Sequence, residues 1–151
     1  MKKIFLMSAL GLTFAFAGSV APVNNAQYQK ECASRHFGYQ PALLSKASWE
    51  KVMGNLSDHF GTDASLGKVE HAQILNYLVE NAGNGKITAN NHSMQISKSP
   101  YFIKEHRKIS AKLIEQKEVG SLSNCLACHT TADKGSYSER AIVIPNYGKW
   151  E

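Results

Sequence analysis

Cys125-Leu126-Ala127-Cys128-His129 is the most informative stretch of this chain, because its spacing restricts what these residues can bind. Two thiols three residues apart can reach the two vinyl groups of a haem, while the adjacent imidazole faces the iron. Cys-x-x-Cys also occurs in zinc sites and in redox-active dithiols, but no second pair of ligands and no βαβ pattern accompanies it here. The motif therefore predicts covalent haem bound to both thiols, with His129 as an iron ligand.

The start of the chain has the pattern of an export signal. Met1-Lys2-Lys3 supplies positive charge, an apolar run covers residues 4–17, and small residues end the run. This pattern is typical of a secretory signal peptide that is cleaved after Ala17, or after Ala21 in a second triplet of small residues. We expect a signal peptide over 1–17, a single domain over 18–151 and a periplasmic location.

The net charge limits the classes of partner. It is +5 for the whole chain, and loss of Lys2 and Lys3 with the signal lowers it by two. Without a cluster of Lys and Arg interleaved with aromatic residues, we expect no nucleic acid partner. No later apolar run is long enough to cross a bilayer, so we expect no stable membrane insertion. The expected partners are redox proteins, and the expected state is a monomer.

The third cysteine lies in an incomplete copy of the same motif. The chain has three cysteines, and Cys32-Ala33-Ser34-Arg35-His36 contains the first thiol and the histidine but has Arg35 at the position of the second thiol. One thioether at most can form there. The spacing alone leaves two interpretations open: a free or disulfide-forming thiol beside a surface histidine, or a second haem held through Cys32 and ligated by His36.

The hydrophobic pattern predicts a mostly α fold of four to five helices packed around haem, with long loops. Apolar residues recur at helical spacing over 48–60 and 65–82, and again from Ser99-Pro100 to residue 119, where Ser is the N-cap and Pro the first helical residue. Residues 23–29 are expected to be mobile. His59 and His106 lie on the apolar stripes of their helices, where an unpaired polar ring would be costly to bury.

Several further motifs lie between residues 28 and 145. They are Glu31-Cys32-x-x-x-His36, Tyr39-x-Pro41-Ala42-Leu43-Leu44, Ser48-Trp49, His59-Phe60-Gly61, Tyr77-Leu78, Phe102-x-x-Glu105-His106-Arg107, Ser123-Asn124-Cys125-x-x-Cys128-His129 and Ala132-x-x-Gly135-x-Tyr137. Together they resemble the bacterial dihaem cytochrome c family over nearly the whole chain. The resemblance implies a small helical periplasmic domain that holds two haem c groups, each with two axial histidines.

The resemblance also implies the ligands. His129 and His36 would be the proximal ligands, and His59 and His106 the distal ones. If each haem takes its nearest histidine along the chain, His36 pairs with His59 and His106 with His129. His71 and His92 match no ligand of the family and are expected at the surface.

The expected function is electron transfer rather than catalysis, because an iron with two histidines has no open position for a substrate. Arg35 departs from the family pattern and affects the first haem. Two haems are favoured over one, since the rest of that pocket is retained and an empty haem cavity would be far larger than protein interiors tolerate. The alternatives are a haem-based gas or peroxide sensor or weak peroxidase with one open iron, a monohaem carrier with a disused first site, and a haem-free thiol or zinc module.

Overall fold

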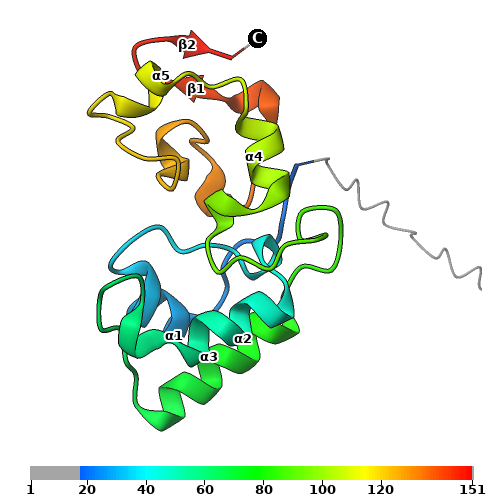
Figure 1. Cartoon of the computed structure of the whole chain (residues 1–151), viewed down its shortest axis with the longest axis vertical. Helices are drawn as coiled ribbons and strands as arrows, with labels where there is room; N and C mark the ends of the chain where they lie inside the picture. The colour runs from blue at the N-terminus through cyan, green and yellow to red at the C-terminus, as the bar shows by residue number, and fades with distance from the viewer. Residues whose placement is uncertain (1–17, 151) are drawn as a thin grey trace, which may run out of the picture.

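The computed structural model describes residues 18–150, and the chain forms two lobes (Figure 1). The expected mostly α fold is confirmed. Its helices are α1 (Ala26–Tyr28), α2 (Lys46–Gly54) and α3 (Lys68–Glu80) in the N-terminal lobe, and α4 (Pro100–His106) and α5 (Ala111–Glu115) in the C-terminal lobe. An antiparallel pair of short strands, β1 (Val143–Ile144) and β2 (Gly148–Lys149), lies in the C-terminal lobe.

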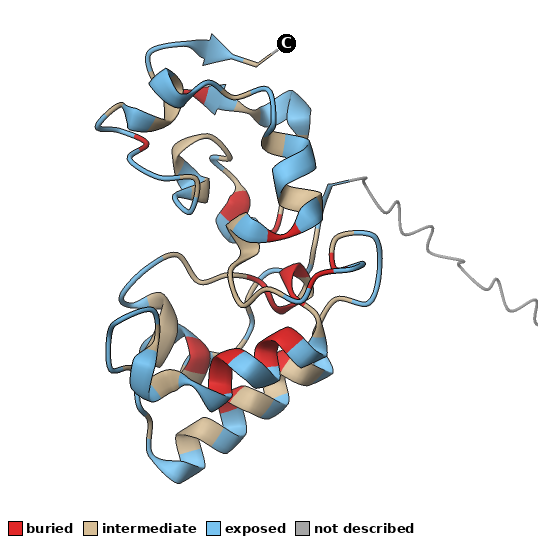
Figure 2. Ribbon diagram, viewed as in Figure 1, coloured by how far each residue is buried: buried red, intermediate tan, exposed pale blue. Residues whose placement is uncertain are grey.

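The apolar core lies in the N-terminal lobe, where buried residues gather on the facing sides of α2 and α3 (Figure 2). Trp49 of α2 and Ile74 and Leu78 of α3 are almost fully buried there, together with Tyr28 of α1. The indole Nε1 of Trp49 donates a 2.7 Å hydrogen bond to the carbonyl oxygen of Pro41, so this buried polar group has a partner. The helical spacing of apolar residues thus formed the packed face that it predicted.

The start of the domain forms a short helix within residues 23–29, the segment that we expected to be mobile. Asn25 caps α1, and its side chain accepts a hydrogen bond from the backbone N–H of Tyr28. The helix continues into a wider π-type turn, Gln29–Ala33. The tyrosine ring holds this segment in place because it is buried against the core.

The helix expected over residues 48–60 begins close to the predicted point but ends at Gly54. Gly and Asn are poor helix formers, and Gly54 is followed by Asn55. His59 therefore lies in an irregular turn rather than on a helical stripe, and its backbone exchanges hydrogen bonds with Thr62.

His71 is also placed differently from our expectation of a surface residue. It is half-buried on α3, and its Nε2 donates a 2.9 Å hydrogen bond to the carbonyl oxygen of Met53, near the end of α2. Carbonyl groups at a helix end have no partner within the helix, so the ring satisfies one of them. His92 is exposed, as expected.

The start of α4 agrees with the prediction. Ser99 is the N-cap, its side chain accepts a hydrogen bond from the N–H of Phe102, and Pro100 is the first helical residue. The helix does not continue to residue 119, however. It ends at His106, and Ser110 is the N-cap of the separate helix α5, a position that serine favours over a helix interior.

The signal peptide expected over residues 1–17 lies outside the described residues. Within residues 18–150, no helix has both the length and the apolar character needed to cross a membrane.

Candidate haem sites

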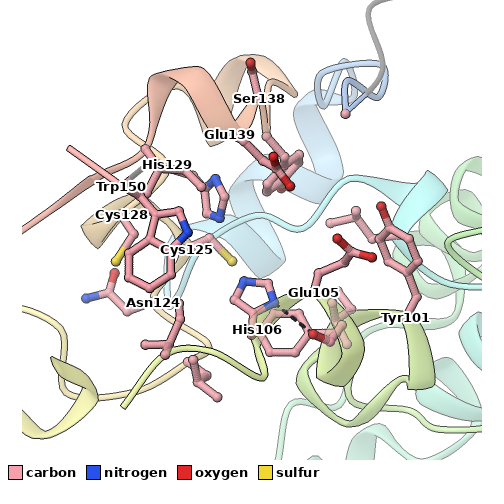
Figure 3. Close-up of a pocket in the computed structure, with 18 of the residues that line it drawn as sticks. Tyr101, Glu105, His106, Asn124, Cys125, Cys128, His129, Ser138, Glu139 and Trp150 are labelled. Atoms are coloured by element: carbon pink, nitrogen blue, oxygen red, sulfur yellow. Dashed lines mark hydrogen bonds between the residues drawn. The ribbon is translucent and has the colours of Figure 1, made fainter. Parts of the chain in front are cut away.

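A large cavity lies in the C-terminal lobe beside the Cys-x-x-Cys-His motif. Its volume is about 1220 Å³, and Cys125, Cys128, His129 and His106 line it (Figure 3). Apolar and cationic side chains share the lining with them: Ile109, Leu113, Ile142, Ile144, Arg107, Lys108 and Arg140. A haem has an apolar ring and two carboxylates, so the size and chemistry of this cavity fit the group that the motif implies.

His106 and His129 face this cavity with their ring centroids 6.1 Å apart. An imidazole nitrogen binds a transition-metal ion at about 2.0 Å, so two rings on opposite sides of one ion have centroids roughly 6 Å apart. The Nδ1 of His106 donates a 2.9 Å hydrogen bond to the carbonyl oxygen of Phe102, one turn earlier in α4. This bond fixes the tautomer that leaves Nε2 as the free metal-binding nitrogen.

The environment of His129 favours the neutral imidazole, which is the metal-binding form. Burial, with a further contribution from His106, lowers the pKa of His129 to about 4. Burial also lowers the pKa of His106. The Nδ1 of His129 is buried and has no hydrogen-bond partner among the described residues. Because an unpartnered buried nitrogen is costly, this ring fits a site that holds a further group.

Burial keeps the two thiols of the motif protonated when nothing is bound to them. Burial raises the pKa of Cys125 to about 11 and also raises that of Cys128. Redox-active dithiols and zinc ligands depend on a lowered thiol pKa, because the thiolate is the nucleophile and the ligand. The raised values argue against a redox-active dithiol, and the described residues contain no group of three or more His, Cys, Asp or Glu side chains that could hold a metal ion.

The incomplete motif forms a second site in the N-terminal lobe. The ring centroids of His36 and His59 lie 6.2 Å apart, and the ring planes are nearly parallel, at 17°. The Nδ1 of His36 donates a 2.8 Å hydrogen bond to the carbonyl oxygen of Phe37, which again leaves Nε2 free. Burial lowers the pKa of His59, and the neighbouring His36 lowers it further. Cys32, at the end of the π-type turn, is half-buried, and Arg35 is exposed.

The second site is more open than the first. His36 is exposed and His59 only partly buried, whereas both histidines of the C-terminal pair are partly buried in the cavity. Phe60 lies next to the distal histidine, with its ring centroid 4.8 Å from that of His59. It is half-exposed, at 52 %, and has a φ of 54°, which is uncommon for an aromatic residue. The two pairs thus place similar ligands in different surroundings.

Sequence reasoning missed the polar residue that joins the two sites. Gln40 is fully buried between the lobes, and its Nε2 donates to the carbonyl oxygen of Ala132 while its Oε1 accepts from the Tyr137 hydroxyl. The neighbouring Tyr39 lies 5.7 Å from the His36 ring, and its hydroxyl donates to the carbonyl oxygen of Ser123. A glutamine beside a proline carries no motif, so no signal in a single sequence could have identified Gln40.

The structure thus brings the predicted residues together in two groups. Cys125 and Cys128 lie with the His106–His129 pair, while Cys32 lies on the same lobe as the pair His36 and His59. We expected each haem to take the histidine nearest along the chain, and in both of these pairs the two rings lie close together. Ligation itself stays a prediction.

Comparisons with known proteins show the family of this chain. The family model for dihaem cytochrome c matches residues 28–137. The crystal structure of a dihaem cytochrome c from Shewanella baltica is 35 % identical, with a TM-score of 0.74, and the match covers 84 % of this chain and 98 % of that one. A structure from Rhodobacter sphaeroides is 37 % identical, with a TM-score of 0.68 and coverage of 77 % and 99 %. Among curated proteins, none matches. The Cys-x-x-Cys-His motif indicates haem attachment, which is what this family requires. The chain therefore belongs to the dihaem cytochrome c family.

Proposed function

We propose that this cytochrome carries electrons in the periplasm through two haem c groups, each held between two histidines. The observation that carries the proposal is the separation of the ring centroids, 6.1 Å for His106 and His129 and 6.2 Å for His36 and His59. Both values match the roughly 6 Å expected for two imidazoles on one ion. Each pair would fill both axial positions of an iron and leave none for a substrate.

Bound haem would supply a one-electron couple between ferric and ferrous iron. Hydrogen bonds from the backbone would hold the histidine rings in place when the iron gains or loses an electron. The Phe102 carbonyl orients the ring of His106, and the Phe37 carbonyl orients that of His36. Small reorganisation of the ligands is what rapid electron transfer requires, and the partners of the rings also set ligand basicity.

The charge of the C-terminal lobe supports an acidic redox partner. From residue 99 to residue 150 the chain has eight lysines and arginines against five carboxylates. The ion pairs within 4 Å in residues 18–150 join Lys30 to Glu31 and Lys46 to Glu50, so both lie in the N-terminal lobe. The unpaired cations around the C-terminal site would speed encounter with an acidic surface, and raised salt should slow the exchange of electrons.

The haem count and the response to carbon monoxide test the proposal. The protein is expressed with maturation factors and measured by intact mass, pyridine haemochrome and visible spectra. We expect two haems per chain, fully low-spin spectra, and a reduced protein that ignores carbon monoxide. A reduced wild-type protein that binds carbon monoxide would support the sensor or peroxidase alternative instead.

A variant identifies the distal ligand of the C-terminal site. His106→Ala should convert one haem to a high-spin form that binds carbon monoxide, because one axial position becomes open. His92→Ala is the matched control, since His92 is exposed and should leave both spectra unchanged. A low-spin His106→Ala protein without new ligand binding would assign the distal position to another residue.

A further inference from the structure

The first described residues pair with the segment that follows the haem-binding motif. Ser19 and Ser136 form an antiparallel bridge. The N–H of Val20 donates to the carbonyl oxygen of Gly135, and the N–H of Tyr137 donates to the carbonyl oxygen of Gly18, both at 2.8 Å. We name residues 18–20 the N-terminal strap.

The two segments approach so closely that the facing residue must be glycine. Gly135 has a φ of 79°, and a Cβ atom there would overlap the carbonyl oxygen of Val20. Gly135 is also buried, so its carbonyl oxygen needs the hydrogen bond that the strap supplies. Gly135 thus leaves the space that the strap occupies and accepts a hydrogen bond from it.

The strap is part of the C-terminal haem site. Its three residues line the same cavity as Cys128 and His129. It is bonded to the backbone of Tyr137, whose ring centroid lies 5.4 Å from that of His129 and whose hydroxyl donates to Gln40. Removing the strap would open one wall of the cavity and release a tyrosine that packs against a proposed iron ligand.

We propose that the N-terminal strap is a permanent wall of the C-terminal haem cavity and that the mature protein begins at Gly18. Export processing would then hydrolyse the peptide bond between Ala17 and Gly18, adding water to leave a carboxylate on Ala17 and an ammonium group on Gly18. Cleavage after Ala21 would instead remove the strap. This inference rests on the proposed export of the protein.

The N-terminus of the exported protein tests the processing site. Intact mass and N-terminal sequencing of the periplasmic wild-type protein should give a chain that starts at Gly18. Signal peptidases require a small residue before the cleaved bond, so Ala17→Asp should accumulate as precursor, whereas Ala21→Asp should mature normally. A wild-type chain that starts at Pro22, or the opposite response of the two variants, would overturn the assignment.

A second experiment tests the wall itself. In Gly135→Ala the added methyl group should displace the strap, admit water to the C-terminal site and lower the midpoint potential of one haem, because water stabilises the more charged ferric form. Gly120→Ala is the matched control: Gly120 also has a positive φ, 68°, but its Cβ would meet no heavy atom within 4 Å. Equal potentials in both variants would overturn the role of the strap.

Hydrogen exchange tests the strap in the wild-type protein, so this experiment does not depend on the folding of a variant. The amide of Val20 should exchange at least about tenfold more slowly than that of Val23, which donates no hydrogen bond among the described residues. Equal rates would exclude a lasting strap. Failure of the proposed electron transfer would show in the haem count and spectra and would leave the N-terminus and the exchange rates unaffected.

Discussion

At the scale of single residues, the two histidine pairs differ in the angle between their rings. The planes of His36 and His59 lie at 17°, whereas those of His106 and His129 lie at 69°. The hydrogen bond from each Nδ1 to a backbone carbonyl fixes the rings of His36 and His106 in these orientations. The relative orientation of two axial imidazoles determines how the d orbitals of a ferric iron split.

These angles predict two kinds of ferric haem in one chain. Electron paramagnetic resonance of the oxidised protein at cryogenic temperature should show a rhombic low-spin signal from the nearly parallel pair and a strongly anisotropic low-spin signal from the steep pair, in equal amounts. His36→Ala should remove the rhombic signal alone. Two signals of the same type would contradict the ring orientations.

Arg35 leads to a second prediction at the residue scale. A haem held through Cys32 alone keeps one vinyl group, and this more conjugated ring absorbs at longer wavelength. The reduced α-band of the wild-type pyridine haemochrome should therefore be split or broadened. Arg35→Cys should sharpen the band without raising the haem count, because Arg35 is exposed and stands where the second thiol would be.

The mass of the wild-type protein could contradict the prediction of a haem held through Cys32. A mass with one haem, together with a gain of a second haem in Arg35→Cys, would make the natural protein a monohaem cytochrome with a disused site. The assignment of Cys32, His36 and His59 would then be wrong. The double variant Cys125→Ala with Cys128→Ala is the control, and it should lose the C-terminal haem in either case.

At the scale of elements, the short helix α4 positions His106 at its last residue. A helix of this length is unstable by itself, so its cap and its packing must hold it. The side chain of Ser99 is buried and accepts from the N–H of Phe102, whereas Ser110 occupies the N-cap of α5 without a side-chain hydrogen bond. Both serines are N-caps, but only Ser99 makes the side-chain hydrogen bond, so Ser110 is a control for it.

Ser99→Ala should destabilise the protein by about 1 kcal/mol, since it removes a helix cap. For a domain of this size that corresponds to a fall in Tm of about 4 °C. Ser110→Ala should change the stability by less than about 0.5 kcal/mol. Thermal unfolding followed by circular dichroism measures both, and equal effects of the two changes would refute the special role of the buried cap.

At the scale of the whole molecule, Gln40 connects the lobes that hold the two sites. Its side chain is 0 % exposed and bonds to Ala132 and Tyr137. The two partners are 92 and 97 residues away along the chain. The main apolar cluster lies in the N-terminal lobe, and the buried apolar residues of the C-terminal lobe, Val119, Ala132 and Ile144, are not part of it. Gln40 is therefore one of the side chains that join the lobes, together with Tyr39, which donates to the carbonyl oxygen of Ser123.

Gln40→Ala should destabilise the protein by about 1 to 3 kcal/mol, because it leaves the Tyr137 hydroxyl without its acceptor and removes one of the two hydrogen bonds to the Ala132 carbonyl, which keeps the bond from the N–H of Gly135. Urea unfolding followed at both haem spectra should change from one transition to two as the lobes uncouple. Gln73→Ala, at an exposed position of α3, is the control and should leave the midpoint unchanged. A single unaltered transition in Gln40→Ala would show that other contacts join the lobes.

Features that depend on neighbours along the chain could be predicted from the sequence. The spacing of Cys125, Cys128 and His129 indicates haem attachment because one short turn brings these three groups together. Ser99 and Pro100 marked the start of α4 for the same reason. The mostly helical fold was predictable from apolar spacing, although the helix ends were not, since weak breakers such as Gly54 compete with that spacing.

Features that depend on contacts between distant segments became visible in the three-dimensional fold. It set His36 against His59 and His106 against His129, fixed the angle within each pair, and buried Gln40 between the lobes. It also set the N-terminal strap against the segment after the haem motif. These contacts join residues separated by many turns of chain, and no local spacing encodes them because their free energy arises from packing in three dimensions.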